Sequence, residues 1–151
     1  MKVSQLCSRE LVIAQEGATV AELARLMRNR HVGAIVVVGT RGGRSVALGI
    51  VTDRDIVRAQ LERAVDLSGL AAFGIMTGDP LVLPEDMEYD EAMGRMLLRG
   101  VRRAPVIDSQ GELMGLLSVD DLVPQVAREL ASLARLLEMQ PTVEGLSASQ
   151  A

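Results

Sequence analysis

An internal repeat constrains the fold of this chain more than any other feature of its 151 residues. Residues 3–38 align with residues 72–107 without a gap, at an offset of 69 positions. An apolar stripe with the helical spacing i, i+3, i+4, i+7 occurs in both copies, at residues 20–27 and 89–96. Identical residues occupy only a few aligned pairs, which are Glu16 and Glu85, Glu22 and Glu91, Met27 and Met96, Arg30 and Arg99, Val32 and Val101, and Val37 and Val106. One structural unit is therefore used twice.

Each copy has the pattern strand, helix, strand, strand, helix. A longer loop at residues 39–45 in the first copy lowers the offset to 66, so that residues 49–52 align with residues 115–118. The expected strands are residues 12–13, 34–38 and 46–51 in the first copy and residues 81–83, 104–107 and 113–117 in the second. Each copy has about 60 residues, which is marginal for an independent core. We therefore expect an α/β (α+β) fold in which the two copies pack on each other.

Two helix starts are marked by local signals. Thr19 followed by Glu22 is a capping box, which predicts the start of the first long helix. In the second copy, Asp90 and Glu91 carry negative charge in the first turn of the corresponding helix, where it stabilises the helix dipole.

The last thirty residues lie outside the repeat. Pro124 predicts the start of a separate helix over residues 124–140, because proline is well tolerated in a first helical turn. Pro141 is expected to end this helix and to leave residues 141–151 as a flexible tail. The helix has an apolar stripe, formed by Val126, Leu130, Leu133, Ala134 and Leu137. Two uses of the stripe stay open, namely covering the chain's own core or binding a partner or second copy. The expected domain division is repeat 1 at residues 1–66, repeat 2 at residues 67–123, the helix at residues 124–140 and the tail at residues 141–151.

The composition excludes several classes of protein. A single cysteine, Cys7, and a single histidine, His31, exclude a disulfide framework and a zinc site built from Cys and His alone. No apolar run approaches the ~20 residues that cross a bilayer, and no signal-peptide core is present, so a cytoplasmic protein is expected. A formal net charge of −4 and only two aromatic residues argue against nucleic-acid binding.

A hydroxyl residue ends a strand in each copy and is followed three positions later by an aspartate. These pairs are Thr52 with Asp55 and Ser118 with Asp121. One interpretation is a helix cap without a ligand. Their recurrence, and the amide groups exposed at a strand-to-helix turn, favour an anion site. A hydroxyl can donate to a phosphate oxygen and a carboxylate can accept from ribose hydroxyls, so the pattern favours a nucleoside phosphate.

Cationic residues near these motifs differ between the copies. Arg102 and Arg103 directly precede the strand at 104–107, whereas the aligned residues of the first copy are Gly33 and Ala34. We therefore expect the phosphate to be held better at the Ser118 site, although a solvated strand edge also explains the two arginines. In the first copy, the candidate ligand contacts are His31 and Arg54.

The duplicated motifs resemble a tandem pair of CBS (cystathionine-β-synthase) domains, called a Bateman module, over about residues 1–123. The resemblance rests on Ile75-Met76-Thr77, on the strand at 104–107 and on the segments at 49–56 and 115–122. It implies two repeats packed sheet to sheet around a pseudo-twofold axis. It also implies two clefts for AMP, ADP, ATP or S-adenosylmethionine, and a homodimer. By position, it assigns Thr52, Ser118, Arg102 and Arg103 to phosphate, Asp55 and Asp121 to ribose, and Ile50 and Leu116 to adenine. The first copy departs from the family pattern at Cys7, Ser8, Gly33 and Ala34.

The expected function is that of a non-enzymatic adenine-nucleotide sensor, which acts on a partner protein through conformational change. The alternatives are a structural or dimerisation module without a ligand, a nucleic-acid-binding protein and, last, an enzyme. Catalysis is not expected because Cys7 and His31 have no orienting third group. The acidic cluster of Asp53, Asp55, Asp120 and Asp121 could hold a magnesium ion. A solvated face is the favoured interpretation of Asp53 and Asp120, and no metal site is predicted.

Overall fold

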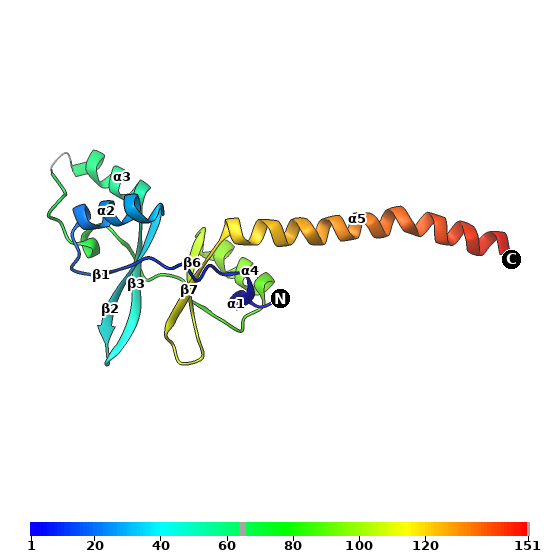
Figure 1. Ribbon diagram of the computed structural model, residues 1–151, viewed down its shortest axis with the longest axis horizontal. Coiled ribbons are helices and arrows are strands. Elements are labelled where there is room, and N and C mark those ends of the chain that lie inside the picture. The colour runs from blue at the N-terminus through cyan, green and yellow to red at the C-terminus, as the bar shows by residue number, and fades with distance from the viewer. Residues whose placement is uncertain (64–65, 151) are drawn as a thin grey trace.

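A computed structural model of the protein describes residues 1–63 and 66–150, with side chains up to residue 139. The chain forms two repeated units from which one long helix extends (Figure 1). The elements in chain order are α1 (Val3–Leu6), β1 (Ile13–Gln15), α2 (Val20–Arg30), β2 (Ala34–Arg41), β3 (Arg44–Thr52), α3 (Asp53–Arg63), the 3-10 helix η1 (Ala72–Gly74), β4 (Thr77–Gly78), β5 (Leu83–Pro84), α4 (Tyr89–Arg99), β6 (Arg103–Ile107), β7 (Leu113–Ser118) and α5 (Val119–Gln150).

Two small mixed sheets confirm the predicted fold class. The first has the strand order β1-β2-β3-β4 and the second has the order β5-β6-β7. In both sheets the leading short strand is parallel to the next strand, which then pairs with its successor in an antiparallel hairpin. The β-branched runs at 34–38 and 104–107 fall in β2 and β6, as their composition predicts.

Each sheet is completed by a segment of the other repeat. Strand β4 lies in the leading segment of repeat 2 but pairs with β3 of repeat 1, with Thr77 opposite Ile50. In the same way, Ser8 of repeat 1 bridges Leu116 in β7 through two N–H···O hydrogen bonds of 3.0 Å. The two repeats are therefore interlocked through their leading segments, an exchange that the sequence alignment does not show.

This exchange also divides the hydrophobic core. Helices α2 and α3 lie against the first sheet, and α1 and α4 lie against the second (Figure 1). The cluster under the first sheet includes Ala72 from η1, and the cluster under the second includes Val3 from α1. Both residues are fully buried. Each core thus needs apolar residues from both repeats, which explains how units of about 60 residues form one stable body.

The predicted helix starts are confirmed for α2 and α4. The Thr19 hydroxyl accepts from the Glu22 N–H at 3.2 Å, and the Glu22 carboxylate accepts from the Thr19 N–H at 2.8 Å. Asp90 and Glu91 lie in the first turn of α4.

Helix α5 differs from the prediction at both ends. The prediction that the helix begins at Pro124 and ends at Pro141 is wrong, because α5 runs through both prolines from Val119 to Gln150. Ser118 caps the helix earlier, and Pro124 removes one hydrogen bond to the carbonyl of Asp120 without ending it. The tail expected at 141–151 is therefore helical to Gln150, and residue 151 lies outside the described residues.

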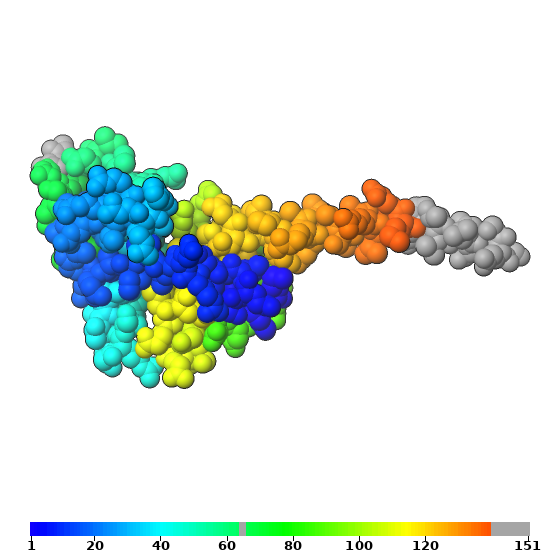
Figure 2. Space-filling view, viewed as in Figure 1, coloured from blue at the N-terminus to red at the C-terminus, as the bar shows by residue number. Residues whose placement is uncertain are grey.

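Helix α5 projects away from the body of the molecule (Figures 1 and 2). Leu122 and Gln125 are buried, whereas every residue from 126 to 139 is exposed. The interpretation that the apolar stripe covers the chain's own core is therefore wrong. Among the described residues, no helix is long and apolar enough to cross a membrane.

Candidate functional site

Two clefts lie between the repeats, and both combine the strand end of one repeat with the leading segment of the other. The first, called the Thr52 cleft, has a volume of about 510 Å³, and the second, called the Ser118 cleft, about 200 Å³. The Thr52 cleft is lined by Ile50, Thr52, Asp53, Arg54, Asp55, Thr77, Asp79, Pro80, Leu81, Arg99, Val101, Arg102 and Arg103. The Ser118 cleft is lined by Ser8, Glu10, Leu11, Val12, Val32, Gly33, Ala34, Arg103, Leu116, Ser118, Asp120 and Asp121.

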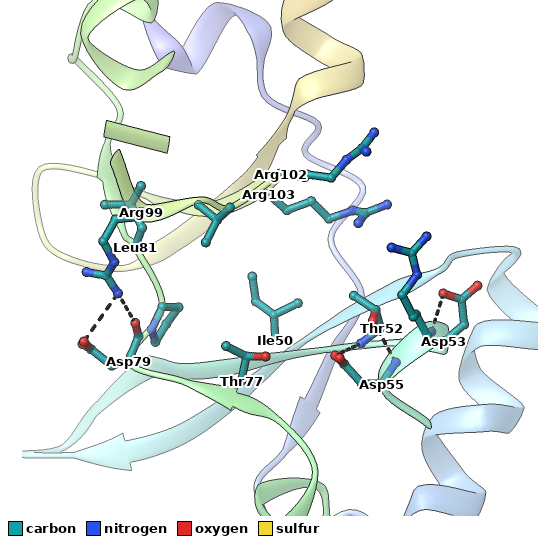
Figure 3. A pocket seen from close by; sticks show the side chains of 13 residues that line it. Ile50, Thr52, Asp53, Asp55, Thr77, Asp79, Leu81, Arg99, Arg102 and Arg103 are labelled. Atoms are coloured by element: carbon teal, nitrogen blue, oxygen red, sulfur yellow. Dashed lines mark hydrogen bonds and ion pairs between the residues drawn. The ribbon is translucent and has the colours of Figure 1, made fainter. Parts of the chain in front are cut away.

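A capping box forms one wall of the Thr52 cleft. Thr52 ends β3 and Asp55 lies in the first turn of α3. The Thr52 N–H donates to Asp55 Oδ2 at 2.9 Å, and the Asp55 N–H donates to Thr52 Oγ1 at 3.1 Å (Figure 3). These reciprocal bonds form a helix cap, and they leave open whether the cleft also binds a ligand. The same bonds fix the Thr52 hydroxyl and the amino end of α3 at the edge of the cleft, where the helix dipole favours an anion.

Arginines from repeat 2 lie across this cleft. Arg102 and Arg103, at the start of β6, face the end of β3 from the opposite wall (Figure 3). Arg99, at the end of α4, is held by Asp79, whose backbone carbonyl accepts from its guanidinium at 2.6 Å. With Arg54, the cleft has four arginines against three carboxylates, so its lining is net cationic.

The predicted placement of Arg102 and Arg103 at the Ser118 site holds for Arg103 and is wrong for Arg102. Both line the Thr52 cleft, and only Arg103 also reaches the Ser118 cleft. Their backbone does lie beside Ser118, since Arg103 pairs with Ser118 in the sheet and the Val119 N–H donates to the Arg102 carbonyl at 3.0 Å. The side chains of both arginines, however, line the wall of the Thr52 cleft that faces the end of β3 in repeat 1. The alignment of the two repeats cannot show that a side chain of one repeat faces the strand end of the other.

The Ser118 cleft has a similar cap but a different charge. The Ser118 N–H donates to Asp121 Oδ2 at 2.8 Å, and the Ser118 hydroxyl donates to the same oxygen at 2.9 Å. The proton of this hydroxyl is therefore already bound within the cap. The lining has one arginine, Arg103, against the carboxylates of Glu10, Asp120 and Asp121. The smaller cleft is thus also the more acidic one.

Most of the predicted ligand contacts lie in one cleft or the other. Ile50 and Arg54 line the Thr52 cleft, and Leu116 lines the Ser118 cleft. The structure does not bring His31 to either cleft. It ends α2 with a left-handed backbone (φ 54°) and is exposed, so its position is explained by its role as the C-cap.

The sequence interpretation missed the leading segments as cleft walls. The missed residues are Thr77, Asp79, Pro80, Leu81, Arg99 and Val101 in the Thr52 cleft and Ser8, Glu10, Leu11, Val12 and Val32 in the Ser118 cleft. The repeat alignment contained a signal for them, since the aligned residues Ser8 and Thr77 each line one cleft. Val32 and Val101 form a second such aligned pair.

The remaining reactive side chains suggest no catalytic or metal centre. Cys7 packs against Gly115, and burial raises the pKa of its thiol, which keeps the thiol protonated and unreactive at neutral pH. Within the part of the chain that the structure describes, no three His, Cys, Asp or Glu residues are grouped to hold a metal ion.

Comparison with known proteins assigns the family. The profile of the CBS domain matches residues 3–62 and 72–128, and the chain therefore belongs to the CBS-domain family as a tandem pair. An uncharacterized 17.7 kDa protein of Acidianus ambivalens is 36% identical over 121 residues, covering 80% of this chain and 70% of that protein. An uncharacterized protein of Methanopyrus kandleri is 28% identical over 123 residues, covering 82% of this chain and 61% of that protein.

A solved structure shares the fold and contains a ligand. A CBS domain protein of Pyrobaculum aerophilum, complexed with AMP, is 30% identical, with a TM-score of 0.72. The match covers 87% of this chain and 99% of that chain.

Proposed function

We propose that this chain is a regulatory module that binds an adenosine nucleotide in the Thr52 cleft and acts on another protein without catalysing a reaction. The observation that carries the proposal is the joining of two half-sites across the cleft. Repeat 1 contributes the Thr52–Asp55 cap at the start of α3, and repeat 2 contributes Arg99, Arg102 and Arg103. The AMP complex of the Pyrobaculum aerophilum protein supports the choice of an adenosine ligand.

The phosphate lies between the cap and the arginines in this proposal. The Thr52 hydroxyl donates to a phosphate oxygen, and the positive end of the α3 dipole stabilises the negative charge. The guanidinium groups of Arg102 and Arg103 add charge-assisted hydrogen bonds from the opposite wall. These donors come from both repeats, so a bound phosphate links them directly.

The nucleoside part has complementary groups in the same cleft. A carboxylate accepts hydrogen bonds only, which suits Asp55 to the two hydroxyls of a ribose. The apolar lining of Ile50, Leu81 and Val101 provides a surface for the adenine ring. Figure 3 shows Ile50 and Leu81 on facing walls.

The two clefts are unequal in this proposal, in the opposite sense to the sequence expectation. The Ser118 cleft is smaller and has more carboxylates than arginines, so it repels a phosphate. We therefore expect one nucleotide per chain, bound in the Thr52 cleft.

Regulation follows from the position of the cleft. A ligand that contacts both repeats shifts their relative packing only as far as it prefers one arrangement over the other. In this proposal the altered packing is transmitted to a partner protein. We also propose that the module acts as a homodimer.

Isothermal titration calorimetry of the full chain with AMP, ADP, ATP and S-adenosylmethionine tests the proposal. At least one ligand is expected to bind with a stoichiometry near one. Replacing Arg102 and Arg103 together by alanine is expected to weaken binding about 10- to 100-fold, because charge-assisted hydrogen bonds are lost. The matched control replaces Arg28 and Arg30, which are exposed on α2 and outside both clefts. No heat for any ligand at millimolar concentration would overturn the proposal.

A structural module without a ligand is the second candidate, and the reciprocal hydrogen bonds of the two caps favour it. The variant Asp55→Asn separates the two. Asparagine keeps a side-chain oxygen for the Thr52 N–H but lacks the carboxylate charge. The nucleotide proposal predicts a melting temperature close to that of the wild type with weakened binding. A purely structural cap predicts no ligand binding in either protein.

A further inference from the structure

The outer part of α5 is an apolar surface that no part of the chain described by the structure covers. The exposed fractions of its large apolar side chains are 57% for Val123, 39% for Val126, 66% for Leu130, 59% for Leu133, 63% for Leu136, 70% for Leu137 and 62% for Met139. Contiguous apolar patches of this kind are uncommon on monomeric proteins and mark interaction sites.

Five of these side chains follow the spacing of a coiled coil. Steps of three and four residues alternate through Val123, Val126, Leu130, Leu133 and Leu137. This is the spacing of the a and d positions of a heptad repeat, at which one helix packs along another. We call these five residues the α5 seam. Ala127 and Ala134 flank the seam, and their small side chains allow a second helix to approach closely.

The inner part of α5 is anchored, but the outer part is not. Leu122 and Gln125 are buried against repeat 2, and the Tyr89 hydroxyl of α4 donates to the Glu129 carboxylate. From residue 130 to 139, every residue is exposed. An isolated helix of that length is marginal in water, because most helical stability in proteins comes from packing of an apolar face. The outer turns therefore require a partner helix.

We propose that this partner is α5 of a second copy of the chain, so that two α5 seams pair. The charges permit self-pairing, because residues 126–139 contain two arginines and two glutamates and none of them occupies a seam position. These residues are Arg128, Glu129, Arg135 and Glu138. A seam can also face its own copy across a twofold axis, which is the commonest symmetry of protein dimers.

The area of the patch agrees with a dimer contact. Covering the exposed seam side chains together with the flanking Ala127 and Ala134 removes on the order of 500 Å² from water per copy, or about 1,000 Å² in total. That total is near the lower limit for a specific protein interface. The inference goes beyond nucleotide binding, and it rests only on the proposed homodimer, to which it assigns a surface.

Sedimentation equilibrium of the full chain tests the pairing. The wild type is expected at twice the chain mass of 16.2 kDa. The double variant Leu130→Glu/Leu133→Glu places charge in the seam and is expected to raise the dimer dissociation constant at least about 100-fold. Its matched control, Ala131→Glu/Ser132→Glu, adds the same charge on the opposite side of the same helical turn and is expected to stay dimeric. All four positions are exposed, so the body stays folded.

Two results would overturn the inference, and only the first of them also overturns the proposed homodimer. If the wild type is monomeric at concentrations of hundreds of micromolar, both the seam pairing and the homodimer are wrong. If the seam variant dimerises as tightly as the wild type, the homodimer stands but forms through another surface. Nucleotide binding is measured separately by calorimetry and is not decided by either result.

Discussion

Two glycines determine how closely the repeats can interlock. At Gly49, a Cβ atom would lie 2.6 Å from the carbonyl oxygen of Thr77, and at Gly115 it would lie 2.7 Å from that of Ser8. Both oxygens belong to the leading segment of the other repeat and cannot move aside as a flexible side chain would. Glycine is therefore required at both positions, because any larger residue would push away the backbone of the other repeat.

Replacing Gly49 by alanine tests this contact. Because the β3–β4 pairing must open to admit a methyl group, Gly49→Ala is expected to lower the free energy of unfolding by about 1–3 kcal/mol. Urea denaturation measures the change. The control is Gly94→Ala in α4, where no atom lies within 4 Å of a new Cβ and alanine is the better helix former. Equal stability of the two variants would contradict the steric explanation.

Among the structural elements, those defined by local signals could be predicted and those defined by distant contacts could not. The capping box of Thr19 and Glu22 and the β-branched runs of β2 and β6 are local, and the structure contains each of them. Strand β4 has two residues and exists only because β3 of the other repeat lies beside it. No pattern within residues 77–78 predicts that pairing.

Helix α5 shows why a proline alone does not locate a helix boundary. Pro124 lies one turn inside the helix, and its missing N–H leaves the Asp120 carbonyl without its helical donor. Leu122 and Gln125 are packed against the body on either side of it. Because this packing and the Ser118 cap hold the segment in place, the helix continues through the proline.

Replacing Pro124 by alanine is expected to stabilise the protein by about 1–3 kcal/mol. Alanine restores one backbone hydrogen bond and removes the steric conflict of the proline ring with the preceding turn. The midpoint of urea denaturation, followed by circular dichroism, should therefore rise. A midpoint below that of the wild type would show that the proline is needed where it is, for instance for a bend in the helix.

At the scale of the whole molecule, the residue types of the site could be predicted but their grouping could not. The hydroxyl and carboxylate of each cap were identified from the repeat, and so were Arg102 and Arg103 as cations. Their grouping depends on the crossing of the two repeats, which places these arginines opposite Thr52. Sequence separation hides this proximity, because the two half-sites lie about fifty residues apart in the chain.

Because each cap faces residues of the other repeat, the two clefts differ in charge although they share the same capping motif. Each cap has a hydroxyl and a carboxylate, but the segment opposite the Thr52 cap contains Arg102 and Arg103, whereas Gly33 and Ala34 lie opposite the Ser118 cap. A duplicated fold has thus diverged into one cationic cleft and one acidic cleft. The proposed sensor uses the first of them.

The most direct test of this account is a backbone amide NMR titration of the full chain with AMP, because it shows which cleft responds. The account predicts that the largest shifts fall on residues 52–55 and 99–103, from opposite walls of the Thr52 cleft. Smaller shifts are expected at residues 118–121. Shifts centred on residues 118–121, with residues 52–55 unchanged, would contradict it.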